Sequence, residues 1–209
     1  MRTLSSATAS VCSSIFLWTC LLIWGPDPVR AQRPSFGRCP DLPTVQNFDV
    51  EQFKGVWYEV ERSFYVFEIT SMCTTFNFTS KPDGNLRVLI KTVSRLTRNP
   101  SIHIGTAAPQ LANPARLNYR VDSLLPSSIS RMLPGAGEYS ILDTDYEQYA
   151  ILWSCSDLGF FHADLIWVMG RDKDLPAEVR HKIYTSLQEL GFDPEILVLT
   201  NHKNCPPQF

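Results

Sequence analysis

The stretch RLNYRVD at residues 116–122 alternates polar and apolar side chains without a break. Leu117, Tyr119 and Val121 share one side, and charged or amide side chains stand between them. Side chains of a strand point alternately to its two faces, so this period of two predicts a β-strand with one face in a core. The stretch LRVLIKTVS at 86–94 repeats the pattern, and its apolar-side positions are Leu86, Val88, Ile90 and Thr92.

Short stretches rich in β-branched and aromatic residues continue on both sides of these two. The candidate strands are 56–62, 73–79, 86–94, 101–106, 116–122, 138–142, 149–155 and 160–169. Eight strands at near-regular spacing predict an all-β fold. They favour either an eight-stranded up-and-down antiparallel β-barrel or a sandwich.

One helix is expected after the strands, over residues 176–190. Its apolar side chains recur at helical spacing, at Val179, Ile183, Leu187 and Leu190. Pro176 suits the first turn and Gly191 suits the position after the last one. The apolar stripe needs a surface to cover it, so we expect the helix to pack on the outside of the sheet. Residues 196–199 could then add an edge strand.

The first 31 residues are typical of a secretory signal peptide. Residues 11–24 form an apolar run too short for a membrane span, which needs about 20 residues. Val29 and Ala31 suit the small-residue positions before a cleavage site. The alternative is an uncleaved anchor, but the run is followed by the helix-breaking and charged residues Pro26, Asp27, Pro28 and Arg30. We therefore predict a signal peptide at 1–31, a single secreted domain at 32–209 and an extracellular location.

Four cysteines remain after residue 31, and in an exported chain they predict two disulfides. Spacing alone allows three pairings of Cys39, Cys73, Cys155 and Cys205. A zinc site is the alternative, but no CxxC motif or histidine cluster accompanies them.

Asn77 begins the sequon Asn-Phe-Thr and is expected to carry a glycan. A glycan does not fit inside a packed barrel, so Asn77 should point outward. Its neighbours Phe76 and Phe78 should then point inward.

Charge and motifs argue against several classes of function. The formal net charge is −2, which does not favour nucleic acid or an anionic membrane as the main partner. The sequence has no GxSxG, HExxH or phosphate-binding glycine loop, and no spaced metal-ligand set. We therefore expect no enzyme activity, no cofactor and no metal. His162 and Asp164 lie two apart on a predicted strand, where a structural hydrogen bond between them is expected.

Three separated motifs resemble those of the lipocalin family. They are Gly55-Val56-Trp57 at the first strand, Thr144-Asp145-Tyr146 in a turn, and Arg171 at the end of the eighth strand. The resemblance is closer to the branch that contains apolipoprotein D and the insect Lazarillo-type proteins. It implies the barrel rather than the sandwich, with Arg171 lying across Trp57 at the barrel floor. It also implies the disulfides Cys39–Cys155 and Cys73–Cys205.

The same resemblance predicts which side chains face a ligand. If Arg171 turns inward, steps of two place Met169, Trp167 and Leu165 inside. Together with the alternating strands, this predicts a lining of Phe76, Phe78, Val88, Ile90, Ile104, Leu117, Tyr119, Val121, Leu165, Trp167 and Met169. The alternative is that these residues only fill the barrel.

The lipocalin resemblance implies an extracellular carrier of a small hydrophobic ligand. A fatty acid, a sterol or a related lipid would suit an apolar lining, in lipid transport, lipid homeostasis or protection against oxidised lipids. Binding of a bilin or another pigment is the alternative. A third interpretation is an interaction protein that acts at a membrane or lipoprotein surface.

Two apolar loops are expected at the open end of such a barrel. They contain Phe64, Tyr65, Val66 and Phe67 in one loop and Leu124, Leu125, Met132 and Leu133 in the other. Exposed apolar patches commonly mark interaction sites, so the loops could dock on a membrane or lipoprotein. They could instead fold over the mouth as a lid.

Overall fold

The computed structural model describes residues 35–63, 71–123, 136–157 and 159–207. Both apolar mouth loops and the predicted signal peptide lie outside these residues. The strands are β1 (Ser35–Phe36), β2 (Gly55–Ser63), β3 (Ser71–Ser80), β4 (Leu86–Ser94), β5 (Pro100–Pro109), β6 (Arg116–Val121), β7 (Gly137–Thr144), β8 (Tyr149–Asp157), β9 (Phe161–Gly170) and β10 (Leu197–Leu199).

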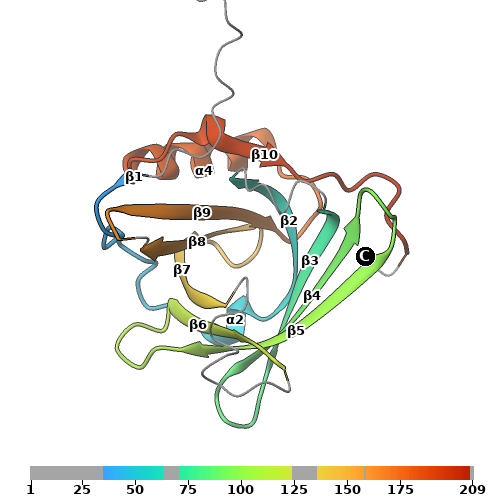
Figure 1. Cartoon of the computed structure of the whole chain (residues 1–209), viewed down its shortest axis with the longest axis horizontal. Helices are drawn as coiled ribbons and strands as arrows, with labels where there is room; N and C mark the ends of the chain where they lie inside the picture. The colour runs from blue at the N-terminus through green and yellow to red at the C-terminus, as the bar shows by residue number, and fades with distance from the viewer. Residues whose placement is uncertain (1–34, 64–70, 124–135, 158, 208–209) are drawn as a thin grey trace, which may run out of the picture. The chain divides into compact units, whose positions relative to one another are not determined.

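The strands from β2 to β9 close into an antiparallel barrel (Figure 1). Each pairs with the next along the chain, and β9 pairs with β2 to complete the ring. Closure leaves no free sheet edge within the ring. The predicted eight-stranded up-and-down barrel is confirmed, and the sandwich alternative is wrong. Strand β10 pairs with one end of β2, which confirms the edge strand expected there.

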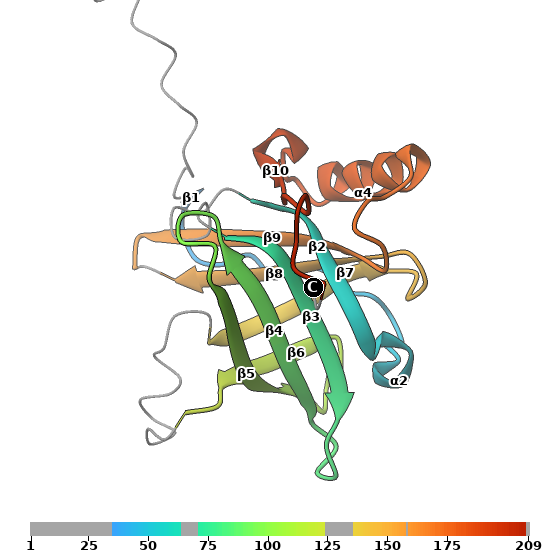
Figure 2. The same ribbon diagram turned by 90° about the vertical axis from the view of Figure 1, so that its right-hand side faces the viewer.

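Helix α4 (Ala177–Glu189) lies on the outside of the barrel, as predicted (Figure 2). Its buried residues Ile183 and Leu187 join a cluster formed by the outward faces of β8 and β9, with Tyr149, Ile151, Trp153, Ile166 and Val168. Gly191 follows the helix at φ 87°, a left-handed conformation that glycine adopts at little cost. None of the described helices is long and apolar enough to cross a membrane.

The short helix α2 (Val50–Phe53) closes one end of the barrel. Asp49 precedes it and accepts hydrogen bonds from the first backbone N–H groups. Phe53 is fully buried, and its ring centroid lies 5.2 Å from that of Trp57 and 5.1 Å from that of Phe78. The Trp57 indole N–H donates to the Phe53 carbonyl at 2.8 Å. This packing forms an aromatic floor at the α2 end of the barrel.

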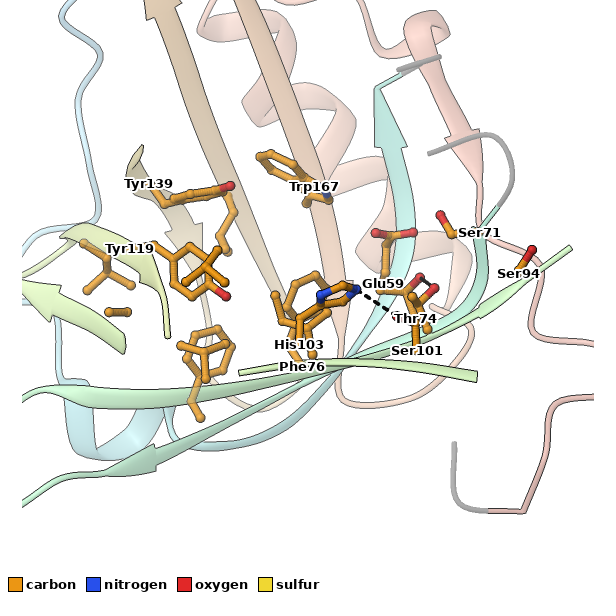
Figure 3. A pocket seen from close by; sticks show the side chains of 18 residues that line it. Glu59, Ser71, Thr74, Phe76, Ser94, Ser101, His103, Tyr119, Tyr139 and Trp167 are labelled. Carbon is orange, nitrogen blue, oxygen red and sulfur yellow. Dashed lines mark hydrogen bonds between the residues drawn. The ribbon is translucent and has the colours of Figure 1, made fainter. Parts of the chain in front are cut away.

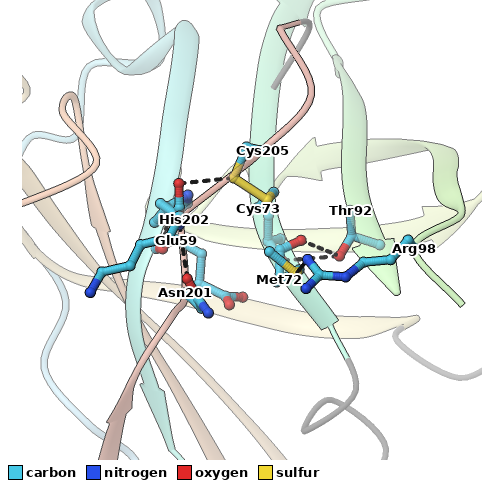
Figure 4. The surroundings of a disulfide bond; sticks show 10 residues. Glu59, Met72, Cys73, Thr92, Arg98, Asn201, His202 and Cys205 are labelled. Carbon is cyan, nitrogen blue, oxygen red and sulfur yellow. Dashed lines mark hydrogen bonds between the residues drawn. A yellow bond between two sulfur atoms is a disulfide. The ribbon is translucent and has the colours of Figure 1, made fainter. Parts of the chain in front are cut away.

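The C-terminal segment completes the wall between β2 and β3. These two strands pair directly only where Gly55–Tyr58 faces Thr75–Phe78. Beyond that point the Thr200 N–H donates to the Val60 carbonyl at 2.9 Å, and the Cys73 N–H donates to the Asn201 carbonyl at 3.0 Å. The Cys73–Cys205 disulfide fastens the segment to β3 (Figure 4). The tail therefore bridges two strands that have separated.

Candidate functional site

A cavity of about 410 Å³ lies inside the barrel (Figure 3). Strands β3, β4, β6 and β9 supply most of its apolar surface, because alternate side chains on each strand must point inward. The apolar and aromatic lining consists of Phe76, Phe78, Val88, Ile90, Ala107, Leu117, Tyr119, Val121, Tyr139, Leu152 and Trp167.

The polar lining residues gather at one end of the cavity. Figure 3 shows Ser71, Thr74, Ser94 and Ser101 together on one side, with Tyr119 and Tyr139 on the other. Ser71 starts β3, Ser94 ends β4 and Ser101 lies near the start of β5, so these hydroxyls sit at the end away from the aromatic floor. The rest of the polar lining is Glu59, Thr92 and His103.

Most of the predicted lining residues border this cavity. They are Phe76, Phe78, Val88, Ile90, Leu117, Tyr119, Val121 and Trp167. Leu165 and Met169 pack within the interior cluster but do not border the cavity, and Met169 is fully buried. These two residues therefore fill the barrel.

The inward assignment of Ile104 is wrong. On β5 the cavity is lined by Ser101, His103 and Ala107, which lie at spacings of two or four. Ile104 has the opposite parity. It pairs with Leu89 of β4, and Leu89 does not line the cavity either. The neighbouring Ile102 is 59% exposed, so the outer face of β5 is apolar here and the inner face is polar.

Several lining residues were not predicted from the sequence. Glu59 stands two residues after Trp57 on β2, so parity with the floor residue was a usable signal. Leu152 lies on β8, where both faces are buried and alternation is lost. The local sequence pattern gave no such signal for Tyr139 and His103. Their inward direction is set by the register of their strands in the barrel.

The Glu59 carboxylate is a buried charged group whose partners are other side chains of the protein. Arg62 forms an ion pair with it, and both side chains are almost fully buried. The Thr200 hydroxyl donates to the same carboxylate oxygen at 2.7 Å. A bulge between Glu59 and Glu61 shifts the register of β2 against β9, so that Arg62 pairs opposite Trp167. Glu59 already faces inward by parity with Trp57, and the shift brings Arg62 to the same inner face.

The predicted contact at the barrel floor is present. The Arg171 guanidinium carbon lies 3.7 Å from the centroid of the Trp57 ring, within the range of a cation–π interaction. Its N–H groups donate to the carbonyls of Tyr146, Val56 and Gln52 at 2.9–3.1 Å. Arg171 therefore joins the start of β2 to the β7–β8 turn.

Residues Thr144, Asp145 and Tyr146 form that turn. One Asp145 carboxylate oxygen accepts three backbone N–H bonds, from residues 147–149. The Thr144 hydroxyl donates to the Tyr149 carbonyl at 2.7 Å, and Tyr146 takes φ 66°. The Tyr146 hydroxyl accepts the Asp49 N–H at 3.0 Å. The motif is turn architecture that also anchors helix α2.

The disulfides are Cys39–Cys155 and Cys73–Cys205, the pairing that the resemblance implied. Atoms of Cys155, His162 and Asp164 lie within 4.8 Å of one another, but the Cys155 sulfur is already bonded to Cys39. His162 contacts Asp164 at 3.3 Å, and the Trp153 indole N–H donates to Asp164 at 2.9 Å. The polar groups of this cluster thus have protein partners.

Comparisons with known proteins agree with this architecture. The model of the Lipocalin-like domain matches residues 48–202. Apolipoprotein D from Cavia porcellus is 32% identical over 178 residues, 85% of this chain and 89% of that protein. The Lazarillo protein of Schistocerca americana is 24% identical over 158 residues, 74% of this chain and 70% of that protein.

A solved structure shows the same fold at low identity. Insecticyanin from the tobacco hornworm Manduca sexta superposes with a TM-score of 0.70 at 18% identity, covering 83% of this chain and 91% of that one. The barrel, its floor and the matched family domain lead to one conclusion. The chain belongs to the lipocalin family.

Proposed function

We propose that this protein is an extracellular carrier of one small hydrophobic ligand, held inside the barrel. The cavity of about 410 Å³, walled largely by aromatic and aliphatic side chains, is the observation that carries this proposal. Its volume falls within the roughly 300–1,000 Å³ typical of small-molecule sites. A fatty acid, a sterol or a related lipid suits this lining.

The distribution of polar groups suggests how such a ligand lies. An apolar body would occupy the part near Phe76, Phe78 and Leu117, and a polar head would meet the hydroxyls of Ser94 and Ser101 near the entrance. Burying the body removes apolar surface from water, at about 25 cal/mol per Å². Carriage of this kind fits lipid transport, lipid homeostasis or protection against oxidised lipids.

Tryptophan fluorescence provides the test. Trp167 lines the cavity, whereas Trp153 belongs to the outer cluster beneath α4. A bound lipid with a quenching group should therefore quench Trp167 and spare Trp153. Trp167→Phe should keep the β-type far-UV spectrum and remove most of the quenching, and Trp153→Phe is the matched control. Failure of every apolar ligand class to bind at micromolar concentration would overturn the carrier proposal.

Pigment binding in the same cavity is the alternative ligand class. A bilin would give the protein purified from its natural source an absorption band in the visible range. A colourless protein that yields lipid on extraction would favour the lipid carrier.

Secretion and glycosylation belong to the same proposal. A signal peptide over residues 1–31 would export the chain, and two disulfides suit an oxidising compartment. Asn77 lies between Phe76 and Phe78, which both line the cavity, so strand alternation puts its side chain on the outer face, and this supports the proposal that it carries a glycan. All four cysteines of residues 35–207 are in disulfides and offer no nucleophilic thiol, in keeping with a binding role rather than catalysis.

Docking on a membrane or lipoprotein is a second candidate function, and one observation at the barrel rim favours it. Leu96 and Phe160 are 85% and 87% exposed. They lie in the β4–β5 and β8–β9 connections, which an up-and-down barrel places at the same end, away from α2. Converting both to Ser should reduce liposome binding and preserve affinity for soluble ligand. Equal liposome binding by the wild type and the double variant would refute this role for the two residues.

A further inference from the structure

The Tyr119 hydroxyl is a buried polar group inside the barrel that lacks a partner. Tyr119 is 8% exposed and lines the cavity, and its hydroxyl has no hydrogen-bond partner among the residues that the structure describes. Figure 3 shows the ring among the apolar lining residues, across the cavity from the serines. Leaving a buried hydroxyl unpaired costs free energy, which a partner would recover.

The position of this hydroxyl is set by its surroundings. The ring lies over Gly105 of β5 so closely that a Cβ built there would sit 2.4 Å from the hydroxyl oxygen. On its other side the ring meets Tyr139 edge to face, with centroids 5.9 Å apart. Tyr139 in turn contacts Trp167 at 5.4 Å. The Tyr119 ring therefore requires glycine at position 105. The ring is held between β5 on one side and the rings of Tyr139 and Trp167 on the other.

The hydroxyl is available as a donor under all physiological conditions. Burial, with a smaller effect from the Asp122 carboxylate, raises the pKa of Tyr119 to about 12. The side chains of its strand neighbours on the lining, Leu117 and Val121, carry no acceptor, and neither does the side chain of Ala107 opposite. Among the described residues the hydroxyl has no hydrogen-bond partner, so a ligand in the cavity can supply one.

We propose that the Tyr119 hydroxyl donates a hydrogen bond to an oxygen atom on the body of the ligand. The favoured ligand class is therefore an oxygenated lipid, which has a carbonyl, ether or hydroxyl oxygen in its apolar part as well as a head group at the serine-rich end. A lipid with a plain hydrocarbon body would leave the hydroxyl unpaired. This inference rests on the proposed carrier function and specifies which lipids that carrier selects.

Matched ligands test the proposal. Stearyl alcohol is compared with keto-stearyl alcohols that carry one ketone near the head, at the middle or near the tail. The wild-type protein should bind at least one of the ketones roughly two- to tenfold more tightly than stearyl alcohol, the range expected for one neutral hydrogen bond. Tyr119→Phe should abolish this preference for the ketone over stearyl alcohol.

Two further variants separate the hydroxyl from general packing. Gly105→Ala forces the Tyr119 ring to move and should also weaken the preference for the ketone. Tyr149→Phe removes a buried hydroxyl from the outer cluster, where it donates to Asp143 at 2.7 Å, and should leave the preference unchanged. Without ligand, Tyr119→Phe should be at least as stable as the wild type, because it removes an unpaired buried group.

The outcomes separate the role of Tyr119 from the carrier function. Binding of stearyl alcohol without any preference for a ketone overturns the role of Tyr119 and leaves the carrier function intact. A preference that survives in Tyr119→Phe does the same, as does a marked loss of stability in the ligand-free variant. If none of the alcohols or ketones binds the wild-type protein, the inference fails, and the carrier function fails with it only if fatty acids, sterols and the other apolar ligand classes do not bind either.

Discussion

Glu59 places a carboxylate in the wall of a largely apolar cavity, and the Arg62 guanidinium forms an ion pair with it. Both side chains are almost fully buried, and each would be costly there without the other. The bulge in β2 brings Arg62 to the inner face, where Glu59 already lies, and the Thr200 hydroxyl donates to the same carboxylate. Replacing either residue alone should therefore lower the stability of the fold.

The coupling of this pair can be measured. Arg62→Met should lower the free energy of unfolding by about 3–5 kcal/mol, because it leaves the Glu59 carboxylate buried without its cation. The double variant Glu59→Gln/Arg62→Met should be less destabilised than Arg62→Met alone, since the amide still accepts from Thr200 and carries no charge. Urea unfolding of Glu59→Gln, Arg62→Met and the double variant provides the measurement. Additive effects of the two substitutions would contradict the pairing.

Gly55 has no side chain, and this lets the Arg171 guanidinium approach the floor closely. It has φ 99°, and a Cβ added there would lie 3.3 Å from the Arg171 Nη1 atom. Gly55→Ala should therefore cost about 1–3 kcal/mol of stability through backbone strain and crowding. Gly84→Ala is the matched control, because Gly84 also has a positive φ, 78°, but no atom lies within 4 Å of its Cβ position. Thermal unfolding should show a larger loss for Gly55→Ala, and equal losses would remove the contact with Arg171 from the explanation.

At the level of elements, alternation predicted the strands that are covered on one face only. Strand β6 follows its sequence pattern, with Leu117 and Tyr119 inside. Strands β8 and β9 are also covered outside by α4, so stretches such as Ile166–Met169 are buried on both faces and give no parity. The rule that apolar means inward failed at Ile104, because the cavity near its mouth is polar.

Bulges were the other obstacle to prediction from sequence. The register of β2 shifts between Glu59 and Glu61, and that of β3 shifts between Met72 and Thr75. A period of two cannot reveal an inserted residue, because the pattern simply changes face. Cys73, at φ 57°, lies within the β3 bulge and bonds to the tail. The bridging role of the C-terminal segment therefore depended on geometry that local sequence does not encode.

The C-terminal segment makes the two disulfides unequal in their effect on ligand binding. Cys73–Cys205 holds the segment whose Thr200 supports Glu59 on the cavity wall, whereas Cys39–Cys155 ties the N-terminal arm to β8. Replacing either pair with alanines should cost about 2–4 kcal/mol of stability. Only the Cys73→Ala/Cys205→Ala variant should also bind ligand several-fold more weakly, as measured by tryptophan quenching. A similar loss of affinity in Cys39→Ala/Cys155→Ala would contradict a specific role for the tail.

For the whole molecule, the core is divided between the inside and the outside of the barrel. The inner cluster includes the floor residues Phe53 and Trp57 and surrounds the cavity, and the outer cluster lies beneath α4 around Tyr149. The cavity therefore reduces packing in the inner cluster and leaves the outer cluster intact. Stability in the ligand-free state rests on the floor and on the outer cluster, and the outer cluster contains a titrating group.

Tyr149 should make the stability of the fold fall at alkaline pH. Burial, together with the hydrogen bond that its hydroxyl donates to Asp143 at 2.7 Å, raises the pKa of Tyr149 well above its ordinary value of about 10. The unfolded chain releases this proton near pH 10 while the folded chain retains it. The contribution to stability is therefore fully present below about pH 10 and is lost as the pH rises from there towards the folded-state pKa.

The variant Tyr149→Phe separates this titration from that of the other tyrosines. It should be less stable than the wild type at neutral pH by about 1–2 kcal/mol, since it loses the hydrogen bond to Asp143. Above about pH 10 its unfolding free energy should fall less steeply than that of the wild type. Tyr119→Phe should also reduce the slope, because the pKa of Tyr119 is raised to about 12. Urea unfolding at a series of pH values gives these slopes. Parallel curves for the wild type and Tyr149→Phe above pH 10 would mean that the buried hydroxyl does not keep its proton in the folded state.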